Sequence, residues 1–478
     1  MRNSTGRTSG DAVITILRRE MLDNIRSLQF LMLLLLTIVL FLSGGFLFAR
    51  KYEQHVAWYS ARVTEAAEKR STVSTVLYPA PGRLAFLSGG GDDQAPAGYE
   101  LYQTGAMRPL PAGPGNTRFP AVPEPDWSFI IKIVFSLYAV LIGFDAVAGE
   151  KERGTLRLIL TGPPGRARLL IAKYAAMMVT LALPLVCGMI VSLITIGIVA
   201  PASLARDTFA GAAGTLVLGT VYLSLFAFLS LFVSSVVHDP SLVLLTLLVA
   251  WIFFTIIIPS TAGILSEKVT DIPGEFATAK ELGPAIKKQV WEKIDLIGKS
   301  AEKGEIATEE ELKRRTDRAF TEAQQNLNSF FESYRKAVRG RAETARWISR
   351  LSPTALFQFA AEDIAGSGVH REERFLRDAR AYSETFDRYV LRKTGKLVAA
   401  SGWGFGTFIE LKGRDVFIGS PHAEEYQGDK SDFPLFTETR RSAGDVLQNA
   451  LVDCEGLLLW NIVLAAAAFG AISRSDVR

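Results

Sequence analysis

Apolar stretches of membrane-spanning length alternate with polar stretches along the whole chain. About 20 apolar residues are enough to cross the ~30 Å hydrocarbon core of a bilayer. Six segments meet that length, at residues 28–49, 127–148, 169–200, 209–237, 242–262 and 446–472. Two long polar blocks separate some of them, at residues 50–126 and 263–445. The pattern predicts an all-α polytopic membrane protein with six transmembrane helices.

The short polar segments indicate how these helices are oriented. Residues 1–27 hold a basic amphipathic stretch, 149–168 form a short loop, and 473–478 form a tail. These segments carry most of the short-loop cations, namely Arg2, Arg7, Arg18, Arg19, Arg26, Lys151, Arg153, Arg157, Arg166, Arg168, Arg474 and Arg478. The one short loop on the opposite side carries only Arg206. Because short loops rich in Lys and Arg stay in the cytoplasm, we expect both termini to be cytoplasmic in a bacterial inner membrane.

The two long blocks are then extracytoplasmic. Residues 79–125 are rich in Pro and Gly, which favours a loop or a small irregular lobe with short strands such as 99–102. The second block predicts a mostly helical domain. A capping-box pattern at Thr308 starts one amphipathic helix that runs through Arg346, and residues 370–393 predict another. We expect these two helices to pack on each other, and residues 403–420 to form a small β element.

Composition agrees with a membrane protein that has large water-exposed parts. The chain has 478 residues, of which 49% are hydrophobic and 21% are charged. A net charge of +4 does not suggest a nucleic-acid partner. Two cysteines provide no disulfide framework, and four isolated histidines do not favour a metal site.

The loop at 149–168 has the pattern of a contact surface for a cytoplasmic partner. Its first half is polar and compatible with a helix, and Thr155 could cap a short helix there. Gly162, Pro163, Pro164 and Gly165 then end any helix. The alternative is an ordinary charged loop that only follows the charge rule for cytoplasmic segments.

Several motifs carry a family resemblance. Residues 150–156 read E-K-E-R-G-T-L, residues 162–166 read G-P-P-G-R, and Ala172-Lys173 follow. This loop resembles the cytoplasmic loop of ABC exporter permeases of the type-two class. Ser234–Pro259, Leu351–Gly368, Asp432–Leu447 and Phe469–Arg478 resemble further parts of one branch, which has large outer domains. That branch includes permeases linked to multicopper-enzyme maturation and to gliding motility.

The resemblance implies a set of partners. The loop would dock on a separate ABC ATPase, present in two copies, through Glu150, Lys151, Glu152, Arg153, Gly154, Thr155 and Leu156. A second permease, identical or related, would complete the complex. ATP and Mg would bind to the partner ATPase, and no cofactor is expected on this chain.

The sequence contains no nucleotide-binding loop of its own. A phosphate-binding loop needs a glycine five residues before Gly-Lys-Ser, but Lys293 stands at that place before Gly298-Lys299-Ser300. No HExxH or GxSxG motif occurs either. We therefore expect a non-catalytic membrane subunit, with ATP hydrolysis on another chain.

Polar and small residues inside the spans leave alternatives open. Asp145, Asp453 and Glu455 would line a substrate path or a dimer seam, or would lie at the membrane interface. Gly211, Thr215 and Gly219 place small residues at every fourth position, which favours close helix packing within the subunit or between two copies.

Two functions fit these observations. The first is a permease that couples an ATPase to export of an amphipathic, lipid-like or peptide substrate, since the spans are mostly Leu, Val, Ala and Phe. The alternative is a non-transporting scaffold or mechanotransmitting subunit, whose outer domain binds or remodels a periplasmic protein. Membrane lipid is a partner in both.

Overall fold

The computed structural model of the protein is mostly helical. It describes residues 9–90, 95–105, 107–111, 125–155, 165–269, 279–395, 397, 406–419, 425–439 and 443–474. Six helical stretches in these ranges are long and apolar enough to cross a membrane. The predicted class, an all-α polytopic membrane protein with a small β element, is therefore confirmed.

The six stretches differ in how regular they are. Four are single α-helices: α2 (Leu28–Lys69), α7 (Arg166–Val199), α8 (Arg206–Val236) and α15 (Ala443–Arg474). The second stretch comprises α3 (Trp127–Phe129), the π-helical η3 (Ile130–Phe135), α4 (Ser136–Gly143) and α5 (Ala148–Glu152). The fifth comprises α9 (Pro240–Ile252), the π-helical η5 (Phe253–Ile257) and α10 (Ile258–Val269). Both π-helical segments therefore lie within candidate membrane spans.

Close helix packing holds this bundle together. Helices α2 and α7 form an extensive contact, and α8 packs on α4, α7, α13 and α15. A Cβ at Gly188 of α7 would lie 2.5 Å from Phe41 and 2.7 Å from Thr37 of α2. Only glycine therefore allows α2 and α7 to approach this closely, which is the use of small residues expected between membrane helices.

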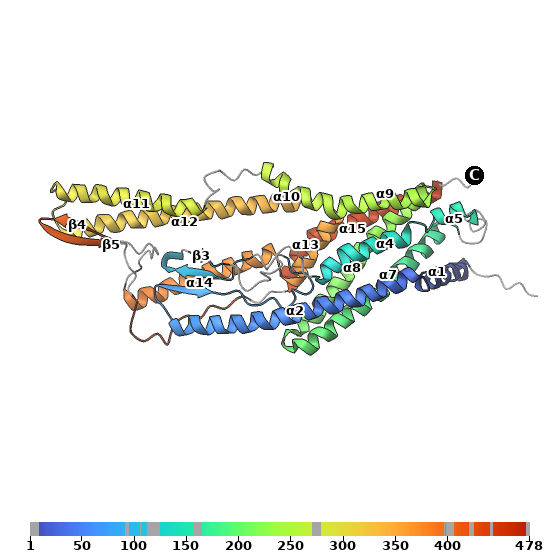
Figure 1. Ribbon diagram of the computed structural model, residues 1–478, viewed down its shortest axis with the longest axis horizontal. Coiled ribbons are helices and arrows are strands. Elements are labelled where there is room, and N and C mark those ends of the chain that lie inside the picture. The colour runs from blue at the N-terminus through green and yellow to red at the C-terminus, as the bar shows by residue number, and fades with distance from the viewer. Residues whose placement is uncertain are drawn as a thin grey trace, which may run out of the picture.

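One end of the bundle gathers the short segments. Helix α1 (Ser9–Ile25) packs on α7, and it lies at the same end as α5 and the C-terminal end of α15 (Figure 1). Ser27 separates α1 from α2 and accepts a hydrogen bond from the Phe30 N–H at 3.1 Å, so it caps α2. On the opposite side of the bundle, the short η4 helix (Pro201–Ser203) joins α7 to α8.

The first outer block and the second form one lobe. Strands β1 (Ser74–Leu77), β2 (Tyr99–Tyr102) and β3 (Met107–Pro109) make an antiparallel sheet in the order β1-β2-β3, with η2 (Gln103–Gly105) after β2. Helix α14 (Val369–Thr394) covers this sheet, and Leu77, Tyr99 and Leu101 pack against Phe375 and Phe386. The predicted separate lobe thus includes a helix that lies about 270 residues further along the chain.

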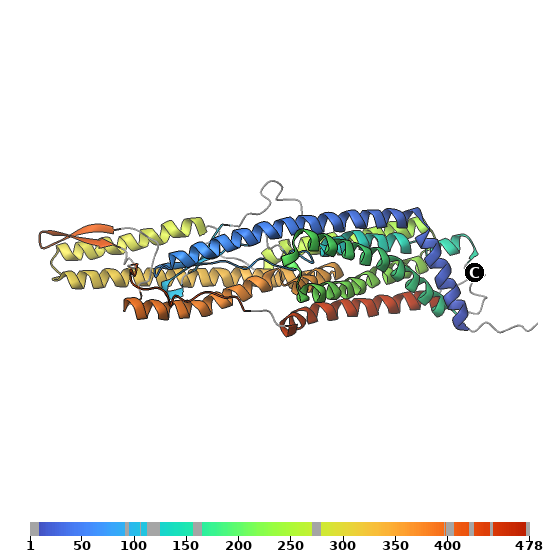
Figure 2. The same ribbon diagram turned by 90° about the horizontal axis from the view of Figure 1, so that it is seen from below.

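A helical arm extends beyond the lobe (Figures 1 and 2). It consists of α11 (Ala279–Glu302), α12 (Glu309–Ser349) and a hairpin of β4 (Gly406–Leu411) and β5 (Arg414–Gly419) at its tip. Val290, Ile294 and Phe320 of the helices pack on Ile409 and Ile418 of the hairpin. Thr308 caps α12 through the Glu311 N–H, as its sequence pattern predicts.

The prediction that the two long outer helices, α12 and α14, pack on each other is wrong. Helix α12 packs on α10 and α11, whereas α14 packs on the sheet. Arg339 of α12 forms an ion pair with Glu373 of α14 at 3.0 Å. The apolar faces of both helices are used, but for two different cores.

Helix α13 (Pro353–Ala365) enters the bundle between the arm and α14. It packs on α8, η5 and η3 and, most extensively, on α15. Leu356, Phe357 and Ala360 belong to the same buried core as Trp127 and Tyr222 of the spans. This helix therefore joins the outer body to the bundle.

The fold generates a test of membrane orientation. Cysteines placed at Ser60 and Lys303, both exposed in the outer body, should react with a membrane-impermeant maleimide added to intact cells. A cysteine at Ser241, in the first turn of α9, should react only after the membrane is opened, because we expect the cation-rich end to lie in the cytoplasm. Cys187 and Cys454 are replaced by serine in every variant. The reverse labelling pattern would show that the assigned orientation is wrong.

Candidate functional site

The short helix α5 is fixed at the cation-rich end by a serine of α8. Ser234 accepts hydrogen bonds from the Val147 and Ala148 N–H groups at 3.0 and 2.9 Å, and donates to the Phe144 carbonyl at 2.9 Å. The first N–H groups of a helix have no partner within it, so this buried hydroxyl caps α5 from another helix. The Lys151 ammonium also donates to the Ser235 carbonyl. Helix α5 and the end of α8 are therefore held together.

A buried lysine fixes the same helix from the other side. Lys173 of α7 is 2% exposed and lies 2.9 Å from the Glu150 carboxylate and 2.7 Å from that of Glu20 in α1. Breaking a buried ion pair typically costs about 3–5 kcal/mol, because one charge is left uncompensated. Glu150, which the sequence suggests as a docking charge, is thus used inside the subunit.

The remaining loop residues face outward. Glu152, Arg153, Gly154 and Thr155 are exposed. Gly154 has φ +69° and its missing Cβ would meet nothing within 4 Å, so it forms a left-handed turn on an open surface.

The last residues of the predicted contact are only partly defined. The Thr155 hydroxyl donates to the Glu150 carbonyl at 3.3 Å, after the end of α5. Leu156 lies outside the described residues, as does any helix that Thr155 would start. Asp145 is exposed at the same end of the bundle.

The small residues of α8 face the rest of this subunit. A Cβ at Gly211 would lie 2.9 Å from Leu87 of the outer lobe, and one at Gly219 would lie 3.2 Å from Ile131 of η3. Thr215 between them is fully buried. The small-residue stripe predicted from the sequence thus packs against Ile131 of η3 and against Leu87 of the outer lobe.

At the opposite end of the bundle, α13 meets a line of polar groups. Lys132 of η3 donates to the Gln358 side-chain oxygen at 2.7 Å, and the Gln358 amide donates to Glu362 at 2.9 Å and to Ser88 at 3.1 Å. Burial raises the pKa of Glu362 to about 7, although the Gln358 hydrogen bond and the charges of Arg346 and Lys132 oppose this.

The two π-helical segments lie where α13 makes its contacts. The Ser352 hydroxyl, which caps α13, donates to the Phe254 carbonyl of η5. Thr354 hydrogen bonds to Tyr222 of α8 at 3.0 Å, and the Tyr222 hydroxyl donates to the Lys132 carbonyl of η3 at 3.1 Å. A π-bulge weakens the regular backbone ladder, so its carbonyls are free for such contacts, and such bulges are frequent at functional sites.

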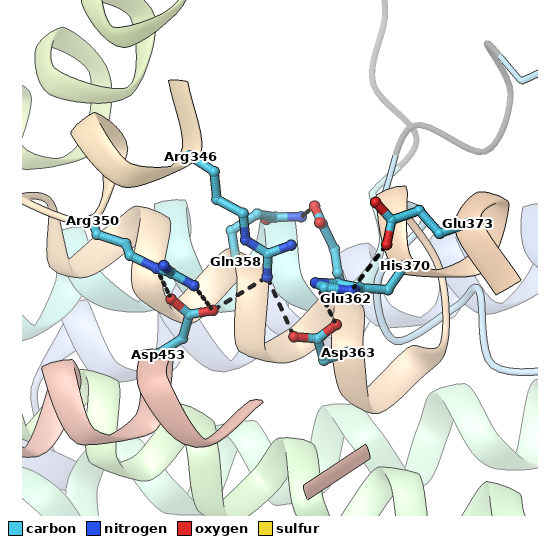
Figure 3. A network of polar contacts seen from close by, with 8 residues as sticks. All are labelled: Arg346, Arg350, Gln358, Glu362, Asp363, His370, Glu373 and Asp453. Carbon is cyan, nitrogen blue, oxygen red and sulfur yellow. Dashed lines mark hydrogen bonds and ion pairs between the residues drawn. The ribbon is translucent and has the colours of Figure 1, made fainter. Parts of the chain in front are cut away.

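A buried ion network joins the arm to the last span (Figure 3). Arg350, which caps the C-terminal end of α12, binds Asp453 of α15 through Nε at 2.7 Å, and Arg346 of α12 binds the same carboxylate at 3.2 Å. Arg346 also reaches Asp363 of α13 at 3.3 Å, and His370 of α14 lies 3.9 Å from Asp363. Asp453 and Asp363 are 0% and 1% exposed. Four helices from different parts of the chain therefore meet in one network.

The structure separates two carboxylates that look alike in sequence. Asp453 is paired with two arginines of the outer body, whereas Glu455 is exposed. Sequence reasoning does not find Arg346 and Arg350, because both sit in an ordinary charged helix about 100 residues before Asp453. Their spacing of four residues, which puts both on one helix face, is the one available signal.

Within the described ranges, no group of three or more His, Cys, Asp or Glu side chains could hold a metal ion. At each end of the bundle, the polar side chains described above bind to neighbouring groups at that same end. The arrangement is suited to holding helices together and moving them as units.

Comparisons with known proteins find similarity to membrane proteins of ABC transporters. A family model described as ABC-2 family transporter protein matches residues 14–403. A relative from Pseudomonas aeruginosa, named probable ABC transporter permease protein NosY, is 38% identical over 79 residues. A protein of the same name from Stutzerimonas stutzeri is 35% identical over 79 residues. Each match covers 16% of this chain and 29% of the relative, so it spans less than a third of either protein.

The ion network generates a stability prediction. Asp453→Ala leaves Arg350 without its carboxylate and Arg346 with only Asp363, so we expect a loss of about 3 kcal/mol in unfolding free energy. The measurement is denaturant unfolding of the purified protein in detergent. Glu455→Ala, two residues away and exposed, is the matched control and should change stability by less than about 0.5 kcal/mol. Equal stabilities for the two variants would contradict the network's role.

Glu362 generates a pH prediction. The folded protein keeps this carboxyl protonated up to pH about 7, whereas the unfolded chain loses the proton near 4.5. Its contribution to stability is therefore fully present below pH 4.5 and is lost as pH rises through 7. The melting temperature of the wild type, relative to that of Glu362→Gln, should therefore fall as the pH rises from 5 to 8. A difference that is constant over this range would refute the raised pKa.

Proposed function

Because this chain belongs to the ABC-2 family of transporter proteins, we propose that it is the permease subunit of an ATP-driven exporter in a bacterial inner membrane. It works with a separate ATPase in two copies and with a second permease, identical or related. ATP and Mg bind to that ATPase, and both termini of this chain lie in the cytoplasm.

The observation that carries this proposal is the double attachment of α5. One side of this helix is fixed to α7 through Glu150 and Lys173, and the other to α8 through Ser234 and Lys151. Residues Glu152 to Thr155 are exposed and take no part in these two attachments, although the Arg153 side chain donates back to the Gly149 carbonyl. A partner that pushes on the exposed side therefore moves α7 and α8 together, which is what coupling of an ATPase to the spans requires.

Helix α8 provides the route from the cytoplasmic end to the outer end. It touches α5 at Ser234 and hydrogen bonds to Thr354 of α13 at Tyr222, twelve residues or about 18 Å away. A shift of α8 therefore reaches the helix that fills the outer end of the bundle. The π-helical segments η3 and η5, which α13 contacts, offer places where the second and fifth spans can change their backbone pairing.

The composition of the bundle interior supports one class of substrate. Its core is built mainly of Leu, Phe, Ala, Val and Ile. Scattered Ser and Thr hydroxyls are buried among them, and some of these, such as Thr180 and Ser235, donate to a backbone carbonyl of their own helix. A small hydrophilic ion would lose its hydration there without compensation. An amphipathic, lipid-like or peptide cargo would lose far less, so export of such a cargo fits this interior best.

A second output is supported by the outer body. The 41-residue α12 runs from the hairpin tip to Arg346 and Arg350, which bind Asp453 of the last span. A helix of this length is about 60 Å long. Movement of the last span would thus swing the tip. Such an arm fits a mechanotransmitting subunit that remodels an extracytoplasmic protein, and the same ATPase would drive it.

The coupling proposal is tested by separating the two faces of the loop. Glu152→Lys with Arg153→Glu reverses two exposed charges and removes one hydrogen bond, from Arg153 to the Gly149 carbonyl. The permease should therefore fold normally but recover less ATPase on co-purification, by about tenfold or more. Gly154→Leu forces a bulky side chain into a left-handed turn and should uncouple ATP hydrolysis from transport. The purified permease alone should show no ATP turnover.

Glu150→Gln is the matched comparison, because Glu150 is bound to Lys173 rather than exposed. It should lower thermal stability in the isolated subunit, a readout that docking charges do not affect. Full ATPase recovery and normal function in the Glu152, Arg153 and Gly154 variants would show that the loop is only a connector.

A further inference from the structure

A cleft opens at the cation-rich end, beside the coupling loop. It has a volume of about 660 Å³ and lies between the end of α8 with Lys151 on one side and the last turns of α15 on the other. Ligand sites of this size are common, since small-molecule pockets usually measure about 300–1,000 Å³. Figure 1 shows α5 and the end of α15 at the same end of the molecule. The cleft is separate from the exposed residues Glu152 to Thr155.

The polar side of the cleft is basic. Lys151, His238 and Arg474 line it, and no carboxylate of the described residues does. His238 and Arg474 are exposed, and Lys151 donates to the Ser235 carbonyl, which positions its ammonium at the wall. Asp239, the nearest acidic neighbour in sequence, instead caps α9 through the Ser241 N–H at 2.8 Å. The charge of the cleft therefore suits an anion.

The opposite wall is apolar and made of small residues. Ala466, Ala467, Gly470 and Ala471 lie on one face of α15, and a Cβ at Gly470 would meet nothing within 4 Å. This face of α15 is therefore uncovered at Gly470 and is not packed against another helix there.

The same face continues along α15 away from the cations. Leu459, Ile462 and Val463 are 63%, 66% and 51% exposed. From Leu459 to Arg474 the helix rises about 22 Å, more than half the thickness of the hydrocarbon core. A ligand that fills the cleft would thus meet cations at one end and a long apolar face at the other.

We propose that this cleft binds one anionic glycerophospholipid of the inner leaflet, with its phosphate group between Lys151 and Arg474 and its acyl chains along α15. The inference rests on the cytoplasmic orientation proposed above and adds a lipid site beside the coupling loop. A segment of the ATPase would approach from water and would leave the apolar face of α15 uncovered. A phospholipid covers both parts of the surface at once.

The test uses the purified full-length chain and native mass spectrometry. Delipidated protein is titrated with phosphatidylglycerol, with phosphatidylcholine of the same acyl chains, and with inorganic phosphate. We expect one phosphatidylglycerol to bind in preference to the other two. Each Lys or Arg near an anionic headgroup contributes about 1 kcal/mol, so Arg474→Ala should weaken binding about fivefold, and Arg474→Ala with Lys151→Ala about 25-fold.

A steric variant tests the site without changing its charge. Gly470→Leu places a side chain into open space, so the protein should fold normally while the cleft is filled. It should abolish the bound phosphatidylglycerol, and Arg474→Lys should keep it. Arg19→Ala is the control, because Arg19 is an exposed cation of α1 paired with Asp23 at the same end of the molecule.

Each other outcome overturns the lipid assignment in a recognisable way. Binding of inorganic phosphate as tight as that of phosphatidylglycerol would reduce the site to a phosphate site. Unchanged lipid binding in Gly470→Leu would show that lipid binds elsewhere. Loss of ATPase co-purification in Arg474→Ala and Gly470→Leu, with lipid binding unchanged, would assign the cleft to the ATPase and leave the proposed permease function intact.

Discussion

Polar side chains buried where water cannot reach must find their partners within the protein, and α13 supplies those partners at the outer end of this bundle. Ser352 and Thr354 satisfy groups of η5 and α8, Gln358 binds the only charged side chain of η3, and Asp363 binds Arg346. Without α13, Lys132 of η3 would lose its Gln358 partner in a largely buried site, and Arg346 would keep only the Asp453 carboxylate. The arm, the outer lobe and the spans therefore depend on this one short helix for their mutual placement.

Sequence patterns predict the parts of this protein whose causes are local. Twenty apolar residues in a row give a span, the capping box at Thr308 starts α12, and alternation gives the hairpin β4–β5. Contacts between distant residues are not encoded in that way. Lys173 looks like one more loop cation, yet it pairs with Glu150 and with Glu20, 153 positions earlier. The choice of α14 rather than α12 to cover the sheet likewise depends on which two apolar faces fit each other.

The two ends of the bundle use charge differently. At the cation-rich end, Lys173 holds α1 and α5 to α7 and leaves the loop's outer face free for a partner. At the outer end, the buried carboxylates of Asp453 and Asp363 pair with Arg346 and Arg350 at the base of the arm. Both proposed outputs, export of a cargo and mechanical action on a partner, would use these same internal connections. They differ only in what occupies the bundle interior and the tip of the arm.

The composite outer lobe has a consequence for biosynthesis. The strands that carry Leu77, Tyr99 and Leu101 leave the ribosome long before Phe375 and Phe386 of α14, which cover them. At translation rates of about 5–20 residues per second the delay is on the order of tens of seconds. Throughout that interval four candidate spans, at Trp127–Glu152, Arg166–Val199, Arg206–Val236 and Pro240–Val269, must be inserted while an apolar sheet edge and face stand uncovered. An uncovered strand edge is a template for pairing with another chain, so the nascent protein is exposed to mispairing with another unfinished copy until α14 is made.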